Sequence, residues 1–105
     1  MFAVETISAK MLDYYVERFD ALIIDLRDRE AYRKSHVRTA KNFPYEEMEE
    51  KIDFPKEKLL VFYCDRGGAS LVVARRYAQY GYRTRSVIGG FHAYRGRNLV
   101  IFKEP

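Results

Sequence analysis

The sequence predicts an α/β protein in which helices flank both faces of a largely parallel central sheet. Apolar runs typical of strands alternate with segments that have helical spacing, which is the pattern of strand–helix–strand units. The run Leu59–Tyr63 is apolar at every position, as expected of a strand that is covered on both faces. With 105 residues, 48% of them hydrophobic, the chain is predicted to form a single domain over residues 1–105.

The first half of the chain is predicted to contain three helices and two strands. These are a helix that begins at residues 6–8, a strand at 21–26, a helix at 29–34, a strand at 40–43 and an acidic helix at 45–51. In the first helix the apolar residues share one face at helical spacing: Met11, Leu12, Tyr15 and Val16. Pro44 ends the second strand, and the acidic helix turns Met48 and Ile52 inward.

The second half continues the alternation. It is predicted to contain a strand at 59–63, a helix at 70–80, a strand at 82–87, a short helical turn after Gly89-Gly90, and an edge strand or packed tail at 98–103. Ser70 is a suitable N-cap for the helix, and Gly81 is a suitable residue to end it. Ligands of such sheets bind beyond the carboxyl ends of the strands, which is where Cys64 falls.

Cys64, the only cysteine, begins a short loop between the central strand and the following helix. The positive end of the helix dipole and its free amides stabilise a thiolate or another anion at this place. Gly67 and Gly68 give the backbone the freedom to curl its N–H groups toward the sulfur, so we expect a positive φ or a close approach there. The pattern therefore favours Cys64 as a nucleophile over an inert core cysteine.

Three ordered segments resemble the rhodanese family over about residues 7–95. The loop Cys-Asp-Arg-Gly-Gly-Ala-Ser at 64–70 resembles the family's active-site loop, which commonly runs Cys-x-x-Gly-x-Arg-Ser. Residues 22–32 and 35–44 resemble its "Asp-hydrophobic-Arg…Glu-hydrophobic" and "His-Ile-x-x-Ala-x-Asn-Ile-Pro" segments. Residues 87–94 resemble its "Leu-x-Gly-Gly-Phe-x-Ala-Trp" segment, with Tyr94 where Trp is usual.

The resemblance implies a sulfurtransferase that holds sulfur as a persulfide on catalytic Cys64, without a metal or an organic cofactor. The expected partners are a small sulfur donor, such as thiosulfate or a persulfide, and a thiol or cyanide acceptor. The implied substrate-binding residues are those of the loop: Asp65, Arg66, Gly67, Gly68, Ala69 and Ser70. Ala69 stands where many thiosulfate-using members carry a second arginine, which weakens binding of a dianion and favours another donor, such as a protein persulfide.

Individual polar residues have alternative roles. Arg66 is either an anchor for an anionic donor or an exposed loop arginine, and Asp65 either pairs with it or opposes the thiolate. Asp25, Arg27 and Glu30 are interpreted as an ion-pair set that braces the site without reacting. His36 is expected to bind backbone groups of a turn, whereas His92 is expected to be exposed.

Two other function classes compete with this interpretation. Phosphatases and arsenate reductases of similar architecture resemble Cys-x5-Arg, but the position of that arginine is Ser70 here, so phosphatase chemistry is disfavoured. A rhodanese-like binding or sulfur-carrier module with little thiosulfate turnover stays open, because Ala69 removes a loop cation.

Composition excludes several other classes. The net charge of +4 comes from basic residues interleaved with acidic ones, so no nucleic-acid surface is predicted. One cysteine permits no internal disulfide, and no Cys/His spacing typical of a zinc site is present in the sequence. The sequence shows no signal peptide and no membrane segment, so we expect a cytoplasmic protein, while its oligomeric state is left open.

Overall fold

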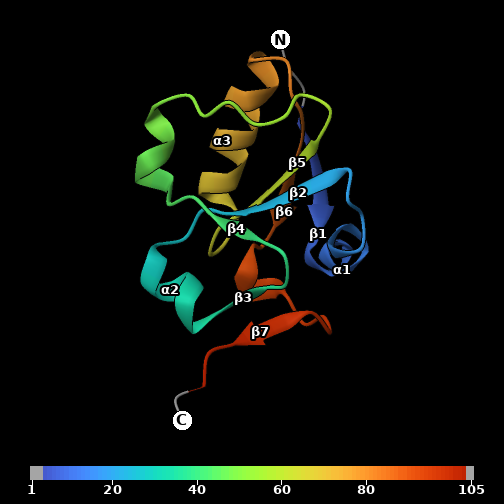
Figure 1. Cartoon of the computed structure of the whole chain (residues 1–105), viewed down its shortest axis with the longest axis vertical. Coiled ribbons are helices and arrows are strands. Elements are labelled where there is room, and N and C mark those ends of the chain that lie inside the picture. The colour runs from blue at the N-terminus through green and yellow to red at the C-terminus, as the bar shows by residue number, and fades with distance from the viewer. Residues whose placement is uncertain (1–3, 104–105) are drawn as a thin grey trace.

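The computed structural model describes residues 4–103 and contains a five-stranded parallel sheet in the order β1-β6-β5-β2-β4 (Figure 1). Its strands are β1 (Glu5–Ser8), β2 (Ala21–Asp25), β4 (Lys41–Asn42), β5 (Leu59–Tyr63) and β6 (Arg83–Ile88). Each neighbouring pair is parallel, with β5 central and in register with β2 from Ala21↔Leu59 to Asp25↔Tyr63. The loops that follow β2 and β5 therefore meet at one edge of the sheet.

Helices cover both faces of this sheet, which confirms the predicted fold class. The long helix α3 (Gly68–Gln79) and the 3₁₀ helix η2 (Tyr45–Glu49) lie on one side, and α1 (Leu12–Val16) lies on the other (Figure 1). Side chains alternate along β5, so that Leu60, Phe62 and Cys64 face α3, whereas Val61 and Tyr63 face α1. All five residues of β5 are buried, as its unbroken apolar run predicts.

The structure corrects the predicted N-terminal helix. Residues 5–8 form β1, which pairs in parallel with β6 from Glu5↔Arg85 to Ser8↔Ile88. The helical spacing begins later, with the 3₁₀ helix η1 (Ala9–Met11) leading into α1. Four residues are too few for a periodicity to show, and the pairing partner lies far away in the chain, so the predicted helix start at residues 6–8 was wrong. The apolar face expected of this helix is present, with Leu12 and Val16 buried.

A second, two-stranded sheet lies beside the first. The strand β3 (Ser35–Val37) was not predicted; it follows α2 (Arg29–Lys34) directly and pairs antiparallel with β7 (Leu99–Ile101). This pairing confirms an edge strand near residues 98–103. The acidic segment forms the 3₁₀ helix η2 with Met48 buried. The 3₁₀ helix η3 (Phe91–Ala93) follows β6, and no helix within residues 4–103 has the length and apolar character to cross a membrane.

Candidate active site

Cys64 follows β5 directly, where the chain turns toward the start of α3. The residue is 7% exposed, and its sulfur accepts hydrogen bonds from the backbone N–H of Gly67 at 3.1 Å and of Ser70 at 3.4 Å. Because α3 begins at Gly68, these donors belong to the first turn of the helix and its preceding residue, where amides lack intrahelical partners. The arrangement stabilises negative charge on the sulfur.

The two loop glycines have different roles. Gly67 adopts a φ of +110°, and a Cβ there would lie 3.2 Å from the Gly89 nitrogen and 3.3 Å from the Val87 oxygen. Gly68 is helical, and a Cβ there would meet nothing within 4 Å. The expected special backbone is therefore found at Gly67, where it turns the amide toward the sulfur.

Ser70 is not the N-cap of α3, contrary to the sequence prediction. The helix begins two residues earlier, and Ser70 is fully buried in its first turn. Its hydroxyl donates to the Gly67 carbonyl at 3.0 Å and shares a hydrogen bond with Ser86 Oγ at 2.9 Å. The side chain therefore ties the loop to β6, while the backbone N–H contacts the sulfur.

The turn after β6 holds the Cys64 loop through its backbone. The Phe91 N–H donates to the Cys64 carbonyl at 2.8 Å, and the His92 N–H donates to the Asp65 carbonyl at 3.0 Å. Gly90 has a φ of +56°, and a Cβ on it would overlap the Cys64 carbonyl oxygen. This close approach leaves room only for a glycine at position 90.

A buried ion pair braces the neighbouring loop after β2. The Arg27 guanidinium contacts the Asp25 carboxylate at 2.7 Å, donates to the Ser35 carbonyl at 2.6 Å, and lies 3.9 Å from the centre of the Phe91 ring. Although burial opposes its charge, Asp25 holds the pKa of Arg27 above its ordinary value. Glu30 does not join this pair; it is exposed and contacts Lys34 at 3.5 Å, so the predicted three-residue set is wrong in that member.

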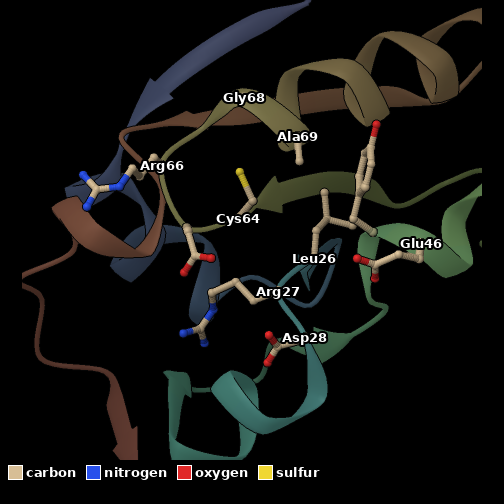
Figure 2. Close-up of a pocket in the computed structure, with 10 residues that line it drawn as sticks. Leu26, Arg27, Asp28, Glu46, Cys64, Arg66, Gly68 and Ala69 are labelled. Atoms are coloured by element: carbon tan, nitrogen blue, oxygen red, sulfur yellow. The ribbon is translucent and has the colours of Figure 1, made fainter.

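The Cys64 sulfur lies at a pocket of about 520 Å³ (Figure 2). The pocket is lined by Leu26, Arg27, Asp28, Tyr45, Glu46, Cys64, Asp65, Arg66, Gly68 and Ala69. Arg66 is exposed, and Figure 2 shows its guanidinium directed away from the sulfur, on the opposite side from Glu46.

Sequence reasoning missed Leu26, Asp28, Tyr45 and Glu46 as pocket residues. Asp28 could have been found, because it follows a strand that neighbours β5 in a parallel sheet and so shares its edge. Glu46 carries no such signal, since its position depends on how η2 packs.

The two histidines lie outside the pocket lining. His36 Nδ1 contacts the Tyr32 carbonyl at 2.7 Å, and its ring stacks on the Tyr32 ring with centroids 3.8 Å apart. This contact to a backbone group agrees with the role expected from the sequence. His92 is exposed, as predicted. Within residues 4–103 no group of three or more His, Cys, Asp or Glu side chains is arranged to hold a metal ion.

Comparison with known proteins finds sulfurtransferases. The chain is 32% identical over 87 residues to the thiosulfate sulfurtransferase GlpE of Coxiella burnetii, covering 79% of both proteins. It is 34% identical over 76 residues to a tRNA sulfurtransferase of Desulfurococcus amylolyticus, covering 72% of this chain and 15% of that much longer protein.

Solved structures share the fold. A rhodanese-like domain protein of Staphylococcus aureus superposes with a TM-score of 0.81 at 24% identity, over 95% of this chain and 100% of that one. The Bacillus anthracis CoADR-RHD structure gives a TM-score of 0.79 at 27% identity, over 87% of this chain and 16% of that one. Residues 8–97 match the rhodanese-like domain family. Cys64 follows a buried strand and accepts a hydrogen bond from an amide at the start of the next helix. Together with the match over residues 8–97 and the sulfurtransferase relatives, this shows that the chain belongs to the rhodanese-like domain family.

Proposed function

We propose that this protein is a sulfurtransferase that carries sulfane sulfur as a persulfide on Cys64. The observation that carries the proposal is the pair of amides, from Gly67 and Ser70, that donate to a cysteine sulfur at an open pocket. Amides in this position favour the thiolate before transfer and a persulfide anion after it. The relatives named as sulfurtransferases support the same chemistry.

The transfer takes two balanced displacement steps. First, the Cys64 thiolate attacks the sulfane sulfur of the donor; a new S–S bond forms, the donor's S–S bond breaks, and sulfite or a thiolate leaves with the electron pair. Second, an acceptor thiolate or cyanide attacks the outer sulfur of the Cys64 persulfide, and Cys64 leaves as a thiolate. Neither step needs an oxidant, a metal or an organic cofactor. Because Cys64 must stay reduced between turnovers, the chemistry fits the cytoplasm.

A second candidate is a sulfur carrier or binding module with little thiosulfate turnover. It is favoured by the exposure of Arg66, whose guanidinium points away from the sulfur, and by Ala69, which supplies no cation. A thiosulfate dianion would then meet few fixed positive groups at the pocket. Both candidates share the Cys64 persulfide and differ in whether turnover follows.

Intact-protein mass spectrometry tests the proposal. We expect incubation with thiosulfate or with a small persulfide to add one sulfur atom to the wild-type chain, to be lost again on addition of cyanide or an acceptor thiol. Cys64→Ser should gain no sulfur. If thiocyanate or the acceptor persulfide accumulates far beyond one equivalent per chain, the protein is an enzyme. If sulfur transfer stops at one equivalent per chain, the protein is a carrier. If neither donor loads Cys64, the sulfurtransferase proposal is wrong.

A further inference from the structure

Three carboxylates surround the pocket at Cys64. Asp28 comes from the loop after β2, Glu46 from η2 and Asp65 from the loop after β5, and all three are exposed. The Asp28 carboxylate also caps α2 by accepting from the Ala31 N–H at 2.8 Å, which fixes its position. Three separate segments thus place negative charge around the pocket that Cys64 lines.

The positive groups of the pocket do not balance these charges. The Arg27 guanidinium is bound by the buried Asp25 carboxylate at 2.7 Å, so this pair contributes little net charge. Arg66 points away from the sulfur in Figure 2, and Ala69 is neutral. The pocket is therefore acidic within a chain whose net charge is +4. The sign of the charge at the pocket is thus opposite to that of the chain as a whole.

The electrostatics divide the site into two zones. At the sulfur, the Gly67 and Ser70 amides favour negative charge. Around it, Asp28, Glu46 and Asp65 disfavour a second negative charge and attract a positive one. A substrate that matches both zones is anionic only at its reacting sulfur and carries a cation a few bonds away.

We propose that the preferred sulfur donor or acceptor is a cationic thiol or its persulfide, with an ammonium or guanidinium group beside the reacting sulfur. This inference rests on the proposed function and adds its substrate class. The same chemistry is available in a small aminothiol and in a cysteine flanked by lysine or arginine in a protein segment. Thiosulfate, a dianion, is then a poor donor for this pocket.

Charged thiol reagents test the pocket without requiring sulfur transfer. Trimethylammonioethyl and sulfonatoethyl methanethiosulfonate are similar in size and opposite in charge. Each forms a mixed disulfide with a cysteine thiolate and releases methanesulfinate, and Cys64 is the only cysteine that can react. With rates normalised to those of mercaptoethanol, we expect Cys64 to prefer the cationic reagent by about tenfold at physiological ionic strength.

Matched variants assign the preference to the pocket. Glu46→Gln removes one lining carboxylate and should lower the cation-to-anion rate ratio about twofold. Glu49→Gln removes an exposed carboxylate from the same η2 segment, outside the pocket lining, and should leave the ratio unchanged. Ala69→Arg should lower the ratio further by adding a cation. An equal ratio in the wild type and Glu46→Gln, or a preference for the anionic reagent, overturns the inference.

Sulfur transfer separates the two proposals. A persulfide on Cys64 should pass faster to cysteamine than to mercaptoethanesulfonate, with rates expressed per acceptor thiolate. The same rates are measured for a cysteine peptide with flanking lysines and for its counterpart with flanking glutamates. A preference for the lysine peptide indicates a protein segment as the substrate, and a preference confined to cysteamine indicates a small thiol. Transfer that ignores acceptor charge overturns the substrate class alone. A failure to form any persulfide overturns the sulfurtransferase proposal, whatever the reagent preference.

Discussion

The loops after β2 and β5 lie side by side at one edge of the sheet, yet they are held in different ways. The loop after β2 depends on side chains: the buried Asp25–Arg27 pair, the Ser35 carbonyl and the Phe91 ring. The loop after β5 depends on its backbone, through hydrogen bonds from the turn after β6 and the left-handed Gly67.

This difference explains which charged side chains remain exposed at the two loops. Because the β5 loop is fixed by its peptide groups, the side chains of Asp65 and Arg66 stay exposed at the pocket. In the β2 loop Asp25 and Arg27 are buried and already occupied, so Asp28 is the charged residue that remains exposed there. Side-chain substitutions should therefore unfold the β2 loop, whereas added Cβ atoms should disturb the β5 loop.

The largest effect is expected from Asp25→Asn. It leaves the Arg27 guanidinium buried without its counter-charge, and we expect a loss of about 3–5 kcal/mol in the free energy of unfolding. Urea denaturation measures the loss. Glu30→Gln is the control, because its carboxylate is exposed and contacts only a surface lysine. Equal midpoints for wild type and Asp25→Asn would contradict the role assigned to the pair.

A smaller effect is expected from Gly67→Ala. The φ of +110° and the contacts with residues 87 and 89 predict a loss of about 2 kcal/mol in the free energy of unfolding. The amide should also turn from the sulfur, so the rate of Cys64 alkylation at neutral pH should fall. Gly68→Ala is the matched comparison, and its melting temperature should stay at or above that of the wild type. If both variants melt and react alike, backbone control of this loop is wrong.

The smallest effect is expected from Tyr94→Phe, which weakens the support shared by both loops. The Tyr94 hydroxyl donates to Asp13 at 2.5 Å and accepts from the Asn98 N–H at 2.8 Å, just after the turn that contacts Cys64 and Arg27. Loss of these bonds should cost about 1.5 kcal/mol of unfolding free energy. Because the support is shared, Cys64 reactivity should change little; a large change would show that the hydroxyl acts on the β5 loop specifically.

The same contact predicts a pH dependence. Burial and the bond to Asp13 raise the pKa of Tyr94 from 10 to about 12. Because the pKa of Tyr94 is higher in the folded state than in the unfolded state, its protonated hydroxyl contributes its full stabilisation below pH 10. This contribution is lost as the pH rises through about 12. The wild type should therefore lose more stability over this interval than Tyr94→Phe does. Thermal melts between pH 9 and pH 12 check this; parallel losses would contradict it.

At low pH the group that titrates in this contact is the Asp13 carboxylate. Although burial alone would raise the pKa of Asp13, hydrogen bonds from Tyr94 and Asn98 hold it below its ordinary value of 3.8. Its stabilising contribution is present above that value and is lost as the pH falls through the lower folded-state pKa. Tyr94→Phe should therefore lose less stability than the wild type at low pH as well as at high pH.

Local features of the sequence determined much of the fold and the position of Cys64. The unbroken apolar run predicted β5, and Gly81, with a φ of +98°, ends the helix as expected. The placement of Cys64 before a glycine-containing turn and a helix predicted its amide environment. These features depend on backbone conformations within a few residues of one another, and local composition reports those conformations directly.

Contacts between distant segments decided the rest. Residues 5–8 became a strand because β6 offered backbone partners about 80 residues away, a distance that no local periodicity records. Whether Arg66 faces the sulfur, whether Glu30 joins Asp25, and whether Glu46 reaches the pocket all depend on side-chain directions set by packing. The sequence by itself determined where Cys64 lies. The tertiary structure decided which charged groups line its pocket, because those groups come from three separate segments of the chain.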